Sequence, residues 1–222
     1  MIEVRQHRVN GIAHPRAFTL NNESELDCWY QQDNGFRFNH VIKASAGSAN
    51  SQQISNPLDR LILKVIRSQA DLIVTSGKTA ISENLKASRF APLLVLTNND
   101  EISFAGLETP STMPVFVTVN DRDWLNPSAK AVGKTQGNLV TWLRQFSKDY
   151  HKVVLETGPL LTRSLAPLLN EACITVVEAN ELSEATESVE RFMGELGINL
   201  KLMQILEIQG NYFFRFYSPQ EN

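Results

Sequence analysis

Two short stretches place glycine and threonine at the end of an apolar run, a combination suited to holding a phosphate. The first is residues 153–161 (VVLETGPLL), where a β-branched run passes through Gly158 and Pro159 into a helical pattern. Glycine removes the Cβ that would keep a ligand off the backbone, and the first turn of a helix presents unpaired N–H groups. Phosphate and pyrophosphate groups bind at such places. Because many α/β proteins turn through glycine for geometry alone, this stretch leaves the structural and ligand-binding interpretations equally open.

Residues 70–79 (ADLIVTSGKT) repeat this plan, with Gly77 and Thr79 after an apolar run. Lys78 resembles the lysine of a phosphate loop, but the spacing G-x-x-x-x-G-K-[ST] is absent, which excludes that motif. No G-x-G-x-x-G is present either, which argues against a standard dinucleotide fingerprint. Two such junctions at strand ends of one sheet would face a common crevice, where open α/β sheets bind ligands.

Length, charge and cysteine usage exclude several classes of function. The 222 residues suffice for one large domain or two small ones, and they carry a net charge of −3 with no long basic run. We therefore expect no nucleic-acid partner, and no apolar stretch is long enough for a membrane helix. The two cysteines, Cys28 and Cys173, lie far apart, and the histidines show no ligand spacing. We expect no disulfide, no metal site and a cytoplasmic location.

Hydrophobic periodicity predicts an α/β fold. Residues 1–36 are polar and predict an N-terminal extension that packs on the main body or contacts a partner, while residues 37–222 predict one domain. In that domain the patterns favour strands at 38–44, 72–75, 93–96, 115–119, near 153, 173–177, 200–207 and 211–217. They favour helices starting at 56–57 and over 82–88, 138–146, 162–169 and 187–196, and a loop or short hairpin between 96 and 115.

The alternation of strands and helices gives the expected architecture. It predicts a mainly parallel sheet with helices on both faces, a three-layer αβα sandwich. Gly197 is expected to cap the helix before it, and a turn at residues 209–211 is expected to join the last two strands as an antiparallel hairpin.

The order and spacing of four segments resemble the pyrimidine reductase domain of riboflavin biosynthesis, in the dihydrofolate-reductase-like superfamily. The first segment is residues 43–47 (KASAG), where the family has a strand followed by Ser-x-Asp-Gly, and the second is residues 59–79, where an R-x-x-A-D pattern precedes a strand and G-x-T. The third segment is residues 114–118 (PVFVT). The fourth is residues 155–159 (LETGP), where the family has Glu-Gly-Gly-Pro. The resemblance covers about residues 38–217 and identifies the chain as a divergent member.

This resemblance implies NADPH as cofactor and hydride transfer to a pyrimidine ring that carries a sugar phosphate. It implies a small-molecule substrate and a homodimer. Thr118 would lie near the adenosine ribose, with Arg122 as a partner for the 2′-phosphate, and Lys43 and Ser45 would contact the substrate. The remaining cofactor contacts would come from the two junctions: Ser76, Gly77 and Thr79 from one, and Glu156, Thr157, Gly158, Pro159 and Leu160 from the other.

The chain departs from the family pattern at residues that bear on catalysis. Ala46 stands where the family has an acidic residue beside the substrate, Thr157 replaces a glycine, and Asn170 with Glu171 stands where the family has Asp-Glu. No nucleophile and base are recognisable, so catalytic residues stay unassigned. The alternative function is a catalytically inactive nucleotide-binding or interaction protein on the same fold.

Several side chains have two interpretations each. Glu156 orients a ribose or bonds backbone at the helix start, and Lys43 meets a substrate phosphate or, the favoured alternative, lines a solvated strand face. For Arg60 and Arg67, a surface ion pair with Asp59 or Asp71 is favoured over an anionic ligand. Helical spacing favours a core or interface position for Trp142, and Trp124 is interpreted in the same way, over a base-stacking platform.

Overall fold

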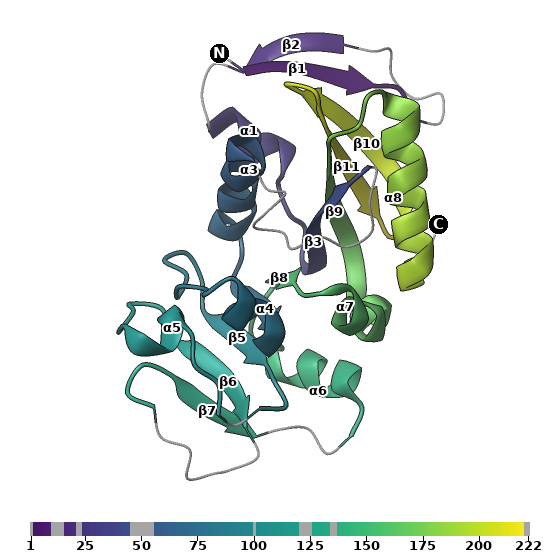
Figure 1. Ribbon diagram of the computed structural model, residues 1–222. Coiled ribbons are helices and arrows are strands. Elements are labelled where there is room, and N and C mark those ends of the chain that lie inside the picture. The colour runs from purple at the N-terminus through teal and green to yellow at the C-terminus, as the bar shows by residue number, and fades with distance from the viewer. Residues whose placement is uncertain are drawn as a thin grey trace. The chain divides into compact units, whose positions relative to one another are not determined.

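The computed structural model describes residues 2–9, 16–20, 24–44, 56–99, 101–119, 126–133 and 137–219. The chain forms two compact units. Unit 1 comprises Met1–Gln32, Arg37–Ile66 and Leu169–Asn222, and unit 2 comprises Asp33–Phe36 and Arg67–Leu168. Figure 1 labels the helices and strands of both units.

Unit 1 holds the antiparallel part of the fold. Its strands lie in the order β2 (Arg16–Leu20), β1 (Ile2–His7), β10 (Lys201–Ile208), β11 (Asn211–Tyr217), β9 (Leu169–Val177) and β3 (Gly35–Lys43). β2 pairs with β1, β1 with β10, β10 with β11 and β11 with β9, all antiparallel. The N-terminal residues thus add strands beside β10, and the division of the chain at residue 36 stays a prediction.

The predicted C-terminal hairpin is confirmed. β10 and β11 are joined by Gln209 and Gly210, whose φ angles are 51° and 74°. Two consecutive positive φ angles are typical of a type I′ turn, whose twist matches that of the paired strands. The local sequence therefore fixed both the position and the geometry of this turn.

Local capping explains where the helices of unit 1 begin and end. α1 (Ser24–Trp29) precedes β3, and α3 (Pro57–Ser68) begins where predicted, because the Asn56 side chain accepts a hydrogen bond from Asp59 N at 2.9 Å. α8 (Leu182–Leu196) starts earlier than expected and ends at Gly197, whose φ of 66° confirms the predicted left-handed cap. α8 packs against β9 and β11.

Unit 2 holds the parallel part of the fold. Its strands lie in the order β8 (Lys152–Glu156), β4 (Leu72–Ser76), β5 (Leu93–Leu96), β6 (Val115–Val119) and β7 (Lys130–Gly133), and every pair is parallel. The first four were predicted from apolar β-branched runs, and these runs are buried as expected for strands covered on both faces. The short, exposed β7 lacks that signal and was not predicted.

The strand order of unit 2 creates a topological switch point. From β4 the chain builds outward through β5, β6 and β7, and then returns to place β8 on the other side of β4. The order therefore reverses between β4 and β8. In open α/β sheets, a crevice forms outside the carboxyl ends of the strands at such a reversal.

The helices of unit 2 correct three sequence predictions. α4 (Gly77–Ser82) follows β4 directly, so the helix expected over 82–88 is wrong, and α5 (Ala105–Glu108) lies in a segment expected to be loop. α7 (Pro159–Leu165) starts at its proline and ends in a 3₁₀ turn, Ala166–Leu168, instead of running to residue 169. α6 (Leu139–Phe146) is confirmed, with Asn138 as its cap. None of the described helices is both long and apolar enough to span a membrane.

Candidate functional site

The two glycine junctions lie on neighbouring parallel strands of unit 2. The register pairs Thr75 of β4 with Glu156 of β8, and the Thr75 hydroxyl donates to the Glu156 carbonyl at 2.9 Å. Each junction begins within the next two residues. Both therefore open at the switch point between β4 and β8, as expected for junctions that serve one crevice.

The first junction is held together by Ser76. Its Oγ caps α4 by accepting a hydrogen bond from Thr79 N at 3.0 Å, and it also lies 2.8 Å from the Thr79 hydroxyl. A Cβ on Gly77 would lie 2.6 Å from both Cβ and Oγ1 of Thr97. The close packing of α4 against the end of β5 therefore requires a glycine here, whether or not a ligand binds.

The second junction differs, because Gly158 faces open space. A Cβ on Gly158 would have no neighbour within 4 Å among the described residues, and its φ of −66° and ψ of 162° suit any residue. Neither packing nor backbone conformation requires a glycine here. The open space above its backbone is the kind of place that a bound phosphate group fills.

Thr157, which stands where the family has glycine, turns its side chain into unit 2. The residue is 2% exposed, and its hydroxyl lies 2.7 Å from the hydroxyl of Thr162. The Thr162 hydroxyl also reaches the carbonyl oxygens of Thr157 and Gly158, both at 3.1 Å. The extra side chain thus braces the turn from inside. Pro159 opens α7, and Leu160 beside it is 86% exposed.

Glu156 has a partner that the sequence did not indicate. Arg67 donates to both of its carboxylate oxygens, at 2.7 and 2.5 Å, and this carboxylate raises the pKa of the guanidinium. The favoured pairing of Arg67 with Asp71 is wrong, because the Asp71 carboxylate instead accepts from the backbone N–H groups of His151 and Lys152. Burial, together with the Glu156 charge, raises the pKa of Glu83 nearby. A contact of Glu156 with a ribose stays a prediction.

A pocket of about 350 Å³ opens at the carboxyl ends of β4, β5 and β6. It is lined by Ser76, Gly77, Lys78, Leu96, Thr97, Asn98, Thr118, Leu139, Trp142 and Leu161. The predicted cofactor residues Ser76, Gly77 and Thr118 are among them, whereas Thr79 and the predicted residues 156–160 are not. The Thr118 hydroxyl accepts from Thr97 N at 2.8 Å and approaches its carbonyl at 3.0 Å, so it also joins the ends of β5 and β6.

The described lining of the pocket is part polar and part apolar. Ser76, Lys78, Thr97 and Asn98 supply hydroxyl, amide and ammonium groups, and none of the described lining residues has a carboxylate. The apolar lining residues are Leu96, Leu139, Trp142 and Leu161. Sequence reasoning missed Thr97 and Asn98, although a polar pair directly after a buried strand is a usable signal. It also favoured a core or interface position for Trp142.

One of the two predicted substrate residues, Lys43, lies at the end of β3 in unit 1 and forms an ion pair with Glu178 at 2.8 Å. A contact of Lys43 with a substrate stays a prediction. Ser45, Ala46, Arg122 and Trp124 lie outside the described residues. Among the residues that the structure describes, no group of three His, Cys, Asp or Glu side chains is arranged to hold a metal ion.

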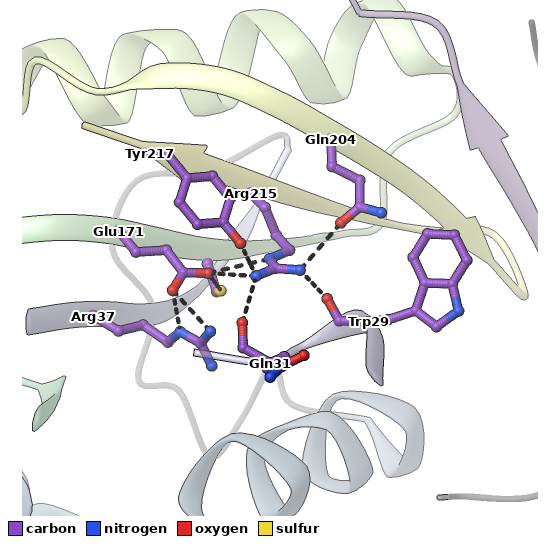
Figure 2. A network of polar contacts seen from close by, with 8 residues as sticks. Trp29, Gln31, Arg37, Glu171, Gln204, Arg215 and Tyr217 are labelled. Atoms are coloured by element: carbon purple, nitrogen blue, oxygen red, sulfur yellow. Dashed lines mark hydrogen bonds and ion pairs between the residues drawn. The ribbon is translucent and has the colours of Figure 1, made fainter. Parts of the chain in front are cut away.

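The densest cluster of charge in unit 1 is built around Glu171 of β9. Arg37 of β3 donates from Nε to Oε2 at 2.8 Å, and Arg215 of β11 reaches Oε1 at 2.8 Å (Figure 2). All three side chains are buried, Arg37 completely. Burial also raises the pKa of the adjacent Cys173 thiol to about 12, so this cysteine is an inert part of the core.

Arg215 ties this cluster to the N-terminal residues. Its guanidinium donates to the backbone carbonyls of Trp29 and Gln31, to the Gln204 side chain and to the Tyr217 hydroxyl (Figure 2). Since these donors serve the protein's own acceptors, the geometry indicates a structural cluster. The candidate site is therefore the pocket of unit 2 with the adjoining Gly158 turn.

Comparisons with known proteins bear on the fold. No family model matches the chain, and no curated protein sequence matches it. Among solved structures, RibD of Acinetobacter baumannii matches with a TM-score of 0.58 and 14% identity over 84% of this chain, which spans 58% of the length of that protein. The riboflavin biosynthesis reductase Rib7 of Saccharomyces cerevisiae matches with a TM-score of 0.57 and 12% identity, over 90% of this chain and 92% of that one.

Dihydrofolate reductase from Enterococcus faecalis, solved with NADP(H), matches with a TM-score of 0.50 and 9% identity, over 82% of this chain and 95% of that one. At these identities the matches establish the fold alone. They agree with the resemblance that the sequence motifs predicted. The chain has the α/β fold that riboflavin-biosynthesis pyrimidine reductases share with dihydrofolate reductase, in a divergent form.

Proposed function

We propose that this protein is an NADPH-dependent reductase that acts on a small molecule of the pyrimidine type, such as a pyrimidine ribosylamine phosphate. The observation that carries the proposal is the pocket at the carboxyl ends of β4, β5 and β6, beside a turn whose glycine has an empty Cβ position. The fold itself is shared with a dihydrofolate reductase solved with NADP(H). When bound, the nicotinamide cofactor supplies the hydride.

The residues at this site fit a phosphorylated dinucleotide. Gly158 leaves room for a pyrophosphate to approach the backbone, which a side chain would prevent. Lys78, Thr97 and Asn98 offer a cation and neutral polar groups, which suit an additional phosphate. These residues support NADPH over NADH, with Lys78 as a candidate partner of the 2′-phosphate in addition to Arg122.

The surrounding residues would position the site. Thr157 and Thr162 brace the turn that presents Gly158, and Arg67 holds the Glu156 carboxylate at the end of β8. Ser76 fixes the start of α4 beside Lys78. Such side chains, locked by hydrogen bonds, keep a binding surface ordered before the ligand arrives, which reduces the entropy cost of binding.

The second candidate is a nucleotide-binding protein that has lost catalysis. Ala46, where an acid would stand beside the substrate, favours it, and so does the engagement of both Glu156 oxygens by Arg67. The same pocket would serve this function. Sustained oxidation of NADPH in the presence of a pyrimidine ribosylamine phosphate would eliminate it. The homodimer and the cytoplasmic location expected from the sequence also stay proposals.

Calorimetric titration with NADPH, and separately with NADH, tests the proposal. We expect saturable binding that is tighter for NADPH. Gly158→Val should weaken that binding at least about tenfold at unchanged thermal stability, because it fills space that the protein itself leaves empty. Gly194→Ala in α8, whose Cβ position is likewise empty, is the matched control and should bind normally. Absence of binding at millimolar NADPH would refute both candidates.

A further inference from the structure

We infer that Trp142 is the platform on which the adenine ring of the dinucleotide stacks. The inference rests on the proposed function and assigns the base to the apolar lining residues of the pocket, which are Leu96, Leu139, Trp142 and Leu161. Trp142 is a positioning and specificity residue in this role. The phosphate-bearing ribose would then contact the polar lining residues Lys78, Thr97 and Asn98.

The first support is that the indole is already held in place. Phe146, one turn further along α6, stacks on it with ring centroids 5.3 Å apart and planes 18° apart. The rings of Phe116 in β6 and Phe146 meet edge to face, with centroids 5.5 Å apart. Tyr150, further along the chain, also stacks on Phe146. The orientation of the Trp142 ring is thus fixed by a packed aromatic column, so little side-chain entropy is lost when a base stacks on it.

The second support is the position of Trp142 on α6. Leu143 next to it is fully buried, whereas Trp142 is partly exposed and lines the pocket. A residue that served only as core would be covered by other side chains, as Leu143 is. The flat face of an indole suits any base, because every base has a π-face, and Trp142 is the single aromatic residue among the described residues of the pocket lining.

The third support is the size of the pocket. Its volume of about 350 Å³ lies near the lower end of the range for small-molecule sites, about 300–1,000 Å³. This suits one end of a dinucleotide better than the whole molecule. The apolar lining residues, with Trp142 among them, match the base of that end, and the polar lining residues, with the cation Lys78 among them, match its phosphorylated ribose.

The test uses ligand fragments and a matched pair of aromatic variants. Calorimetric titrations are made with NADPH, with adenosine 2′,5′-bisphosphate, and with reduced nicotinamide mononucleotide, which lacks adenine. In Trp142→Ala we expect affinity for the first two to fall roughly five- to hundredfold, since base–aromatic stacking is of that size. Affinity for the mononucleotide should not change. Trp142→Phe should retain most of the binding, because the variant keeps an aromatic ring at this position. Adenosine 2′,5′-bisphosphate should no longer quench the tryptophan fluorescence of this variant.

Tyr150→Ala is the control for packing. It removes a ring from the same aromatic column but does not touch the pocket lining. Equal weakening by Tyr150→Ala and Trp142→Ala would overturn the inference, because the effect would then come from a loosened column. Wild-type affinity of Trp142→Ala for adenosine 2′,5′-bisphosphate would also overturn it. If Trp142→Ala fails to fold, Trp142→Leu takes its place, and thermal denaturation identifies the folded variants.

The outcomes separate this inference from the proposed function. A wild-type protein that binds adenosine 2′,5′-bisphosphate through Trp142 but not NADPH would refute the reductase proposal and keep the base platform. A protein that binds NADPH with no contribution from Trp142 would refute the base platform and keep the reductase proposal. Binding of neither ligand at millimolar concentration would refute both.

Discussion

Unit 1 and unit 2 use their polar side chains in opposite ways. In unit 1, Arg37, Glu171 and Arg215 are buried together, both guanidinium groups pair with the one carboxylate, and Arg215 also donates to backbone carbonyls. In unit 2, the polar residues Lys78 and Asn98 line an open pocket whose described residues include no carboxylate. The charged cluster of unit 1 therefore makes internal contacts, whereas the described lining of the candidate site carries one charge, on Lys78. Charge density alone would have pointed away from the proposed site.

The two regions also differ in what a substitution should cost. A buried ion pair adds little net stability compared with apolar residues, but removal of one partner leaves a charge without compensation. A pocket residue that the protein's own packing does not need can change at little cost to folding and a large cost to binding. The predictions below measure this contrast.

The largest effect is expected for Glu171→Gln. It would leave the Arg37 and Arg215 guanidinium groups buried without their carboxylate, and we expect the free energy of unfolding to fall by about 3–5 kcal/mol. Denaturant unfolding measures this change. Glu178→Gln, which removes an exposed partner of Lys43, is the control and should cost less than about 1 kcal/mol. Equal costs for both variants would show that the cluster is not structural.

Next in size is Gly77→Ala. The new Cβ would lie 2.6 Å from Thr97, so the end of β5 must shift, and we expect a loss of about 1–3 kcal/mol in stability. Gly158→Ala, at the second junction, should stay within about 0.5 kcal/mol of wild type because nothing lies near its Cβ position. Thermal or denaturant unfolding of the two variants compares the junctions directly. A destabilised Gly158→Ala would mean that the second glycine is structural too.

His40 makes the stability of the protein depend on pH. It stacks on Phe38 and on Phe192 of α8, and burial lowers its pKa to about 4 from an ordinary value of 6.5. The unfolded chain therefore binds the proton more readily than the folded protein. The free energy of unfolding is not reduced by this titration above about pH 6.5, and it falls as the pH drops toward 4. Allowing for partial exposure of the ring, we expect a loss of about 1–2 kcal/mol between pH 7 and pH 5.

Denaturant unfolding across that pH range, with His40→Phe alongside, identifies the group responsible. The variant keeps a ring in contact with both phenylalanines and removes the titration, so its stability should change less over the same range. An identical pH dependence in both proteins would assign the effect to other groups.

The smallest effect is expected for Thr157→Val. It removes a hydroxyl that bonds Thr162 inside the second junction, and we expect a cost of about 0.5–1.5 kcal/mol. Ser164→Ala, which removes an exposed hydroxyl from α7, is the control and should leave the free energy of unfolding nearly unchanged. A larger loss of NADPH affinity than of stability in Thr157→Val would show that the turn must be held rigid for binding.

Much of the candidate site was visible in the sequence because its signals are local. The glycines at 77 and 158, the apolar runs before them and the helical pattern of residues 138–146 depend only on neighbouring residues, and the structure places them as expected. The helix predicted over 82–88 failed for a local reason as well. Ser76 caps a helix that starts inside the junction, and the apolar pattern alone did not reveal that start.

The sequence by itself determined the alternation of strands and helices, the closing hairpin with its Gln209–Gly210 turn, and the two glycine junctions. Only the tertiary structure decided that Arg67 binds Glu156, that Thr157 points inward, and that Trp142 lines a pocket instead of the core. Periodicity and capping are set by residues a few positions apart. Side-chain partners depend on strand order and register, which join residues as distant in sequence as Arg37 and Glu171.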